Sequence, residues 1–407
     1  MKKTLLLTIF ATLFLCITAQ AQEGEREHFN ENEGVFAALS ARLANSEKQS
    51  EKMEKALEYL KIYGFLQGMY EWSDDKNGNA STGTSSFSVY RARVILTGDF
   101  YKSKRTGATL NYWFYFDFAR LPDNPFLDLR IRYHLSDKFN LIVGHLQNPF
   151  HFQDLFRPSK FEFIDYSYAA ARVAKMGGTD VTSTDVKLRE LGFRVFGELG
   201  ERNGYNIFHY SAGVLSSIGV LQKNNNESAD FFCRLAVKPS HDLAFSLYGQ
   251  WGEGNFTKVK ENNPQKYADF RWSGNSDYVR TARWGTGFSY ITKTLYMRGD
   301  YIAGLTGNLP TESAYLECGY KHHFSKDRGF AWAGAMVDYY CYNTFDYIKR
   351  NTAIAPIDLR YTLSVGWEPC YYYRIQLAYS LEQCVNYTFN NNRRFANSLK
   401  LLVTAAW

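Results

Sequence analysis

Residues 126–135 read Phe-Leu-Asp-Leu-Arg-Ile-Arg-Tyr-His-Leu. From the second residue onward, leucine, isoleucine and tyrosine alternate with aspartate, arginine and histidine. Successive side chains of a β-strand point to opposite faces of a sheet, so this period of two predicts a strand. One face of that strand is apolar and the other is charged, so the two faces are expected to lie in different surroundings.

With this segment included, the alternation occurs in sixteen segments between residues 61 and 407. We expect strands at 61–72, 86–101, 107–119, 126–135, 138–147, 187–199, 204–220, 226–238, 241–253, 278–291, 294–305, 312–323, 329–343, 357–368, 371–386 and 396–407. The gaps between them are alternately short, with 2–5 residues, and mostly longer, with 5–39 residues. Short turns on one side and long loops on the other are typical of a transmembrane β-barrel, with the apolar face toward lipid and the polar face toward the lumen. The sequence therefore predicts an all-β, 16-stranded antiparallel transmembrane barrel over 61–407.

Composition supports strands and excludes several classes of protein. Aromatic residues make up 17% of the 407 residues, with 30 Gly and 9 Pro, which favours strands. No run of about 18 apolar residues follows the N-terminal segment, so a helical membrane protein is excluded. After residue 21 the chain has 45 Lys and Arg against 41 Asp and Glu, too even a balance for a nucleic-acid-binding protein.

The N-terminus has the features of a secretory signal peptide over residues 1–21. Lys2 and Lys3 precede an apolar run over 5–17, and residues 19–21 read Ala-Gln-Ala, a small-residue cleavage site. Five cysteines follow, an odd number without paired spacing: Cys233, Cys318, Cys341, Cys370 and Cys384. Neither a disulfide scaffold nor a metal site nor a cofactor is expected.

Residues 22–60 form a leader with a heptad pattern. The core positions of that pattern are Phe36, Leu39, Leu43, Ser46, Ser50, Met53, Leu57 and Leu60. Charged residues lie between them, as on the solvent side of a helix. The pattern fits an amphipathic helix packed on a neighbour, or a short parallel coiled coil between identical chains that the two serines weaken.

Several motifs follow one another in a recognisable order. Residues 63–68 read Tyr-Gly-Phe-Leu-Gln-Gly, 90–93 Tyr-Arg-Ala-Arg, 144–150 Gly-His-Leu-Gln-Asn-Pro-Phe, and 190–194 Glu-Leu-Gly-Phe-Arg. In this order the chain resembles the phosphate-selective porin O and P family of Gram-negative outer membranes. The resemblance implies a trimer of 16-stranded barrels whose narrow pore carries lysines and arginines for anions. One position differs, since Gln147 stands where the family often has a lysine.

The gap over 148–186 is the longest in the barrel. A pore of sixteen strands is wider than side chains can fill, so a long loop is expected to narrow it. This one is rich in phenylalanine and tyrosine and carries Arg157, Lys160, Arg172 and Lys175. These bases are candidate anion-binding residues, or else solvated charges above the pore.

Inward-facing bases outnumber inward-facing acids on the expected strands. The bases are Arg91, Arg93, Arg130, Arg132, Arg194, Arg234, Arg283, Arg298, Lys321, Arg360, Arg374 and Lys400. The acids are Asp99, Asp117, Asp128, Glu190, Asp300, Glu317, Glu368 and Glu382. Arg91, Arg93, Arg130, Arg132 and His134 cluster and are candidate pore-lining residues, because confined arginines attract anions. The alternative is that the arginines pair with acids and stiffen the wall.

No motif for catalysis or nucleotide binding occurs. We therefore expect a passive diffusion channel for small anionic solutes such as phosphate, a homotrimer in outer-membrane lipid with its leader in the periplasm. Two alternatives come from other classes: a surface barrel with a plugged pore, and an outer-membrane enzyme.

Overall fold

The computed structural model describes residues 59–407 apart from 75–82, 122–124, 149, 152, 154–156, 174–188, 217–228, 256–277, 308, 325–327, 343–356 and 386–393. The predicted signal peptide and nearly all of the predicted leader lie outside the described residues, as does Lys175. No helix within the described ranges is long and apolar enough to cross a membrane.

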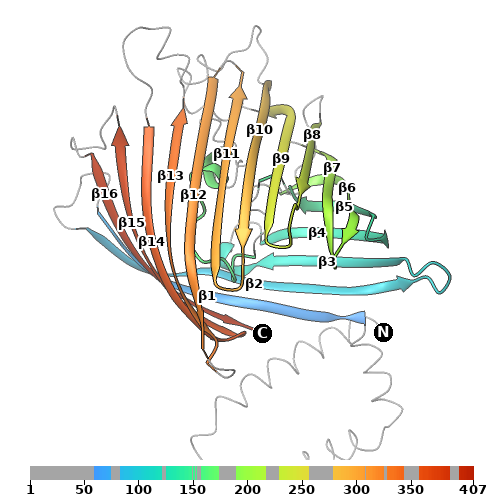
Figure 1. The fold of residues 1–407 in the computed structure, drawn as a ribbon, viewed down its shortest axis with the longest axis horizontal. Helices are drawn as coiled ribbons and strands as arrows, with labels where there is room; N and C mark the ends of the chain where they lie inside the picture. Colours follow the sequence, from blue (N-terminus) through green and yellow to red (C-terminus); the bar gives the residue numbers. More distant parts are fainter. Residues whose placement is uncertain are drawn as a thin grey trace, which may run out of the picture. The chain divides into compact units, whose positions relative to one another are not determined.

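The described strands form one closed antiparallel barrel (Figure 1). The strands are β1 (Lys61–Ser73), β2 (Thr84–Lys102), β3 (Thr109–Asp117), β4 (Phe126–Ser136), β5 (Phe139–Gln147), β6 (Arg189–Arg202), β7 (Tyr205–Leu215), β8 (Asp230–Val237), β9 (Leu243–Asn255), β10 (Tyr278–Ile291), β11 (Leu295–Thr306), β12 (Leu309–His323), β13 (Phe330–Tyr342), β14 (Ile357–Cys370), β15 (Tyr373–Val385) and β16 (Phe395–Ala406). Each strand pairs with its neighbours in sequence, and β1 pairs with β16. The predicted 16-stranded antiparallel barrel is confirmed.

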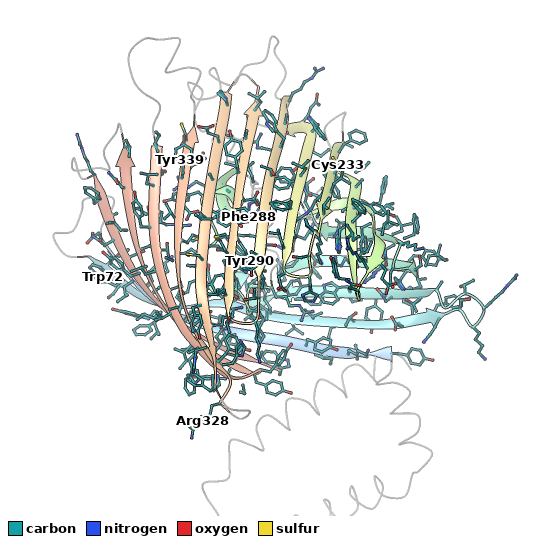
Figure 2. All side chains as sticks on the ribbon, in the orientation of Figure 1. Trp72, Cys233, Phe288, Tyr290, Arg328 and Tyr339 are labelled. Atoms are coloured by element: carbon teal, nitrogen blue, oxygen red, sulfur yellow. The ribbon has the colours of Figure 1, made fainter. Side chains whose placement is uncertain are left out.

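The two faces of the wall are reversed relative to those of a water-soluble barrel. Along β14, Tyr361, Leu363 and Val365 point outward with 41–61% of their surface exposed. The alternating Arg360 and Thr362 point inward and are buried. Lipid is the solvent that favours an apolar exterior around a polar lumen, so this pattern indicates a membrane barrel. Figure 2 shows side chains along the whole wall, with Tyr339 near one end of the strands and Arg328 near the other.

One side of the barrel carries tight turns. Asn203 and Gly204 join β6 to β7 with φ angles of 50° and 79°, the two-residue hairpin turn that suits Asn-Gly. One connection on the opposite side is shorter than expected. The predicted loop over 306–311 is wrong, because β12 already starts at Leu309 and only two residues separate it from β11. Pro310 pairs with Leu305 of β11 and lies beyond the last pair of β12 with β13, close to the strand start, where proline is tolerated. β7 ends at Leu215 and β8 begins at Asp230, and the rest of the expected strand ends at 217–220 and 226–228 lies outside the described residues.

A β-bulge near the start of β4 overturns one expected orientation. Tyr115 pairs with Asp128 and Phe116 pairs with Phe126, so Leu127 is the extra residue between them. A bulge turns the side chain of its extra residue away from the regular alternation. Leu127 is therefore only 2% exposed and not on the outer apolar face.

The barrel closes between the first and the last strand. The backbones of Gly64 and Trp407 exchange two hydrogen bonds, of 3.1 and 3.0 Å. A Cβ atom on Gly64 would lie 2.3 Å from the Trp407 ring and 2.7 Å from the carbonyl oxygen of Arg93. The seam therefore requires glycine at this position.

Candidate functional site

The described parts of the long loop between β5 and β6 pack against the inner wall. Its buried apolar side chains are Phe150, Phe161, Phe163, Tyr168, Ala169 and Val173. They contact wall residues of β9 and β11 to β13, namely Tyr248, Tyr296, Ile302, Tyr315, Met336 and Tyr340. A short π-helix, η3 (Ala169–Val173), contacts β11, β12 and β13. Burial of these aromatic rings holds the loop inside the barrel.

Wall side chains also capture the backbone of the loop. The donors to loop carbonyl oxygens are Arg234 to His151, Arg283 to Val173, Arg360 to Tyr166, Arg374 and Gln376 to Phe161, and Trp332 and Ser364 to Glu162, over 2.5–3.1 Å. An irregular buried segment leaves carbonyl groups without partners of their own, so these donors satisfy groups that would otherwise cost free energy. Most of the inward arginines of β8 to β15 thus hold the loop.

Acids of the loop pair with bases of the wall. Glu162 lies 2.6 Å from Arg298 and 2.5 Å from Lys321, and Asp165 lies 2.9 Å from Lys400. Burial raises the pKa of Glu162, but the charges of Arg298 and Lys321 outweigh burial and lower it to about 2. Both loop acids therefore offset basic charge on the wall.

The bases predicted in the loop do not act together. Two of them pair with acids of β14, Lys160 with Glu368 at 2.6 Å and Arg172 with Asp358. Arg172 also lies 4.0 Å from the ring centre of Tyr168. Arg157 is exposed. The charges of Lys160 and Arg172 are thus partly offset by their partners.

The two arginines of β2 join neighbouring strands. Arg91 donates to the Gln67 side chain at 2.8 Å, across to β1. Arg93 pairs with Asp117 at 2.8 Å and donates to the Tyr115 hydroxyl at 2.9 Å, across to β3. The interpretation of wall struts fits this pair.

Three further arginines, on β4 and β6, have neutral partners. Arg132 donates to the Asn140 side-chain oxygen at 2.7 and 3.1 Å, and Arg194 donates to the Ser211 hydroxyl at 2.8 Å. Within the described part of the chain, none of Arg130, Arg132 and Arg194 forms an ion pair with a carboxylate. The charges acting most strongly on Arg194 are those of other arginines.

Pairing across β4 to β6 brings several predicted site residues together. Arg132 and Arg194 each pair with Ile142 of β5, from its two sides. His134 lies 2.6 Å from the Asn140 oxygen that also binds Arg132. The four residues Arg130, Arg132, His134 and Arg194 therefore form one basic cluster. The sequence had grouped Arg130, Arg132 and His134 with Arg91 and Arg93, and had placed Arg194 only on the inward face.

Sequence reasoning missed some participants. Arg189 pairs with Asp128 at 2.9 Å, whereas alternation along the expected strand 187–199, with Glu190 inward, placed Arg189 on the outward face. Glu162 and Asp165 lie in an irregular loop, and only their acidity signalled a role. Among the described residues, no group of three or more His, Cys, Asp or Glu side chains could hold a metal ion.

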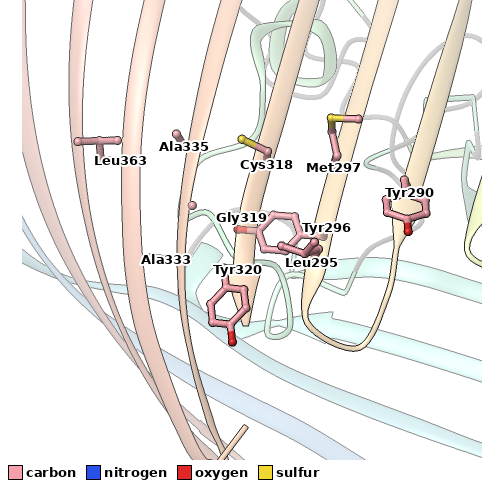
Figure 3. A pocket seen from close by; sticks show the side chains of 11 residues that line it. Tyr290, Leu295, Tyr296, Met297, Cys318, Gly319, Tyr320, Ala333, Ala335 and Leu363 are labelled. Atoms are coloured by element: carbon pink, nitrogen blue, oxygen red, sulfur yellow. The ribbon is translucent and has the colours of Figure 1, made fainter. Parts of the chain in front are cut away.

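One hollow among the described residues lies on the outer wall of β10 to β14. It measures about 620 Å³, and Met297, Cys318, Tyr320, Ala333 and Leu363 are among its lining residues (Figure 3). Its lining is almost entirely apolar, and Tyr320 and Leu363 are 49% and 61% exposed. The hollow belongs to the outward apolar face and does not contribute to the basic cluster.

Comparison with protein families agrees with the motifs and the barrel. Residues 60–242 match the phosphate-selective porin O and P family. The match covers β1 to β8, which include the basic cluster and the long loop. The expected family resemblance is confirmed over this range. No curated protein sequence matches the chain.

Solved structures extend the likeness to the whole barrel. The trimer form of OmpT, an outer membrane protein of Vibrio cholerae, is 11% identical with a TM-score of 0.57, covering 86% of this chain and 99% of that one. The outer membrane channel DcaP of Acinetobacter baumannii is 11% identical with a TM-score of 0.56, covering 86% and 97%. An anion-selective porin from Comamonas acidovorans is 8% identical with a TM-score of 0.57, covering 86% and 99%. At such low sequence identities, the structural likeness shows a shared fold alone. The family match and the closed barrel together support an outer-membrane channel.

Proposed function

We propose that the chain forms a homotrimeric, non-enzymatic porin for passive diffusion that prefers small anions. In this proposal the segment 148–186 is the constriction of the pore, and the leader 22–60 lies in the periplasm. Arg91, Arg93, Arg130, Arg132, His134, Arg194, Arg157, Lys160, Arg172 and Lys175 remain the candidate anion-binding residues. Arg130, Arg132 and Arg194 carry the largest part of the preference.

The observation that carries the proposal is the difference between the two sides of the lumen. Glu162 and Asp165 of the loop are neutralised by bases of the wall. Arg130, Arg132 and Arg194 are half-buried and have amide, hydroxyl or aromatic partners in place of carboxylates. Asp128 acts on Arg130, and Asp99 and Asp137 act on Arg132, without forming an ion pair. Confined positive charge that no ion pair neutralises concentrates mobile anions.

Two observations support the assembly and its place. The trimer and the Gram-negative outer membrane follow from the family resemblance, and one structural neighbour has a trimer form. An outward apolar face such as that of β14 suits lipid contact.

The test is the zero-current potential of the full chain in planar bilayers under a KCl gradient. Changing Arg130, Arg132 and Arg194 together to Gln should lower the ratio of chloride to potassium permeability by about twofold or more at low salt. The difference in permeability ratio between the variant and the parent should shrink at 1 M KCl, where the Debye length is about 3 Å. Gln keeps hydrogen-bonding capacity, so the barrel should still assemble.

A matched control removes three charges from the turns. Lys104, Arg105 and Lys138 are exposed between strands, and their change to Gln should leave the permeability ratio close to that of the parent. An unchanged ratio in the Arg130, Arg132 and Arg194 variant would refute the anion preference. A chain that gives no conductance steps at all would favour the plugged surface barrel.

A further inference from the structure

The inner wall over β3 to β6 combines guanidinium groups with aromatic rings. The Arg130 guanidinium lies 5.2 Å from the ring centre of Trp113. Those of Arg132 and Arg194 lie 5.2 and 4.5 Å from the ring centre of Phe196. We call these five residues, Trp113, Arg130, Arg132, Arg194 and Phe196, the arginine–aromatic wall.

Strand pairing makes this wall continuous. Trp113 pairs directly with Arg130 across β3 and β4. Ile142 of β5 separates Arg132 from Arg194 and belongs to a buried apolar cluster against which Phe196 packs. The arginines of the wall therefore lie around a patch of apolar side chains.

The aromatic rings of this wall differ from those that hold the loop. Phe161 and Phe163 of the loop are each 2% exposed and belong to a packed core. Trp113 and Phe196 are only half-buried. Their remaining surface is apolar and lies next to positive charge without carboxylate partners.

The loop is fastened to a different arc of the barrel. Its described segments bind β8 through Arg234, β10 through Arg283, β14 through Arg360 and β16 through Lys400. The arginine–aromatic wall lies on β3 to β6, outside that arc. The contacts that dock the described segments of the loop therefore do not use the arginine–aromatic wall.

We propose that the arginine–aromatic wall binds organic anions that carry a planar aromatic ring, such as an aromatic carboxylate, in preference to small inorganic anions. This inference rests on the anion-preferring channel proposed above. A carboxylate accepts two parallel hydrogen bonds from a guanidinium group. An adjoining ring packs against the exposed faces of Trp113 and Phe196, in offset or edge contact, and removes apolar surface from water.

The experiment measures block of chloride current through the full chain in planar bilayers by three carboxylates. Benzoate provides charge and a planar ring, cyclohexanecarboxylate has the same charge and similar size without a π-face, and acetate has charge alone. Benzoate should block at a concentration about threefold or more below that of cyclohexanecarboxylate, with acetate weaker than both. Equal block by benzoate and cyclohexanecarboxylate would overturn the proposal.

Variants assign the block to the wall. Trp113→Leu with Phe196→Leu keeps apolar volume and all charges, and it should weaken benzoate block about fivefold while leaving the KCl zero-current potential unchanged. The matched control, Phe114→Leu with Phe193→Leu, alters the same two strands on the outer face, where these rings are 38% and 44% exposed. Benzoate should block this control channel at the same concentration as the parent channel. A block unaffected by the first double variant would refute the site.

Failure of the inference is distinguishable from failure of the proposed function. Anion preference in KCl without selective benzoate block would leave the porin proposal and overturn this one. A parent channel without anion preference in KCl would overturn the proposed function and, with it, this inference. If the double variant does not assemble, the comparison of benzoate with cyclohexanecarboxylate in the parent decides.

Discussion

At the scale of the residue, arginines on the same face of the wall have different tasks. Arg360 and Arg374 donate to loop carbonyls, Arg93 pairs with Asp117, and Arg194 contacts a hydroxyl and a ring. The alternation of the strands predicted that these side chains face inward. It did not predict their partners, because those belong to strands and loops distant in sequence.

Gly64 gives a prediction at this scale. Gly64→Ala should destabilise the seam by about 1–3 kcal/mol, since the added Cβ would meet the Trp407 ring and the backbone of β2. The measurement is the temperature at which the folded barrel converts to the unfolded form on semi-native gels, which should fall.

Gly68 is the matched control on the same strand. Nothing lies within 4 Å of a Cβ atom built on Gly68. Gly68→Ala should therefore leave the conversion temperature unchanged or slightly raised. Equal behaviour of the two variants would contradict the requirement for glycine at the seam.

At the scale of the element, regular strands were predictable and irregular ones were not. The predicted start of β10 and start of β14 coincide with the observed residues, because a period of two persists over many positions. The bulge at Leu127 and the early start of β12 were missed, since one extra residue or a tolerated proline leaves little trace in the pattern. The path of the long loop was also beyond the sequence, because carbonyl partners from β8 to β15 determine it.

Because Glu162 helps to dock the loop, we expect its loss to change the single-channel current. Glu162→Gln removes the carboxylate that Arg298 and Lys321 share, and it should weaken loop docking by up to about 3 kcal/mol. Single-channel current should then become noisier and larger on average. Asp137→Asn, at an exposed turn, is the control and should leave current traces like those of the parent.

The same carboxylate predicts a dependence on pH. Its pKa is lowered to about 2 in the docked loop, from 4.5 in a released one, so its contribution is complete above about pH 4.5 and is lost as the pH falls toward 2. The parent current should stay quiet from pH 7 to 5 and become noisy below 4. Glu162→Gln should lack this component, and identical acid responses in the two proteins would contradict the role of Glu162.

At the scale of the whole molecule, closure and the reversed faces follow from one sequence property. An apolar face that continues around sixteen strands leaves no edge and no water-soluble exterior. In a barrel of this kind, the polar side chains of the strands face the lumen. In the proposed function, the contrast between a loop-bearing arc and a basic arc accounts for the anion preference.

Assembly of three such barrels is the last prediction, and it depends on the heptad over Phe36–Leu60. If this heptad joins three chains, deletion of 22–60 should lower the melting temperature of the trimer on semi-native gels and leave barrel insertion intact. Replacing Ser46 and Ser50 by Leu should act in the opposite sense, because apolar core residues strengthen a coiled coil. Melting that responds to neither change would mean that the leader is an amphipathic helix packed on a neighbour, and that contacts between barrels alone hold the trimer together.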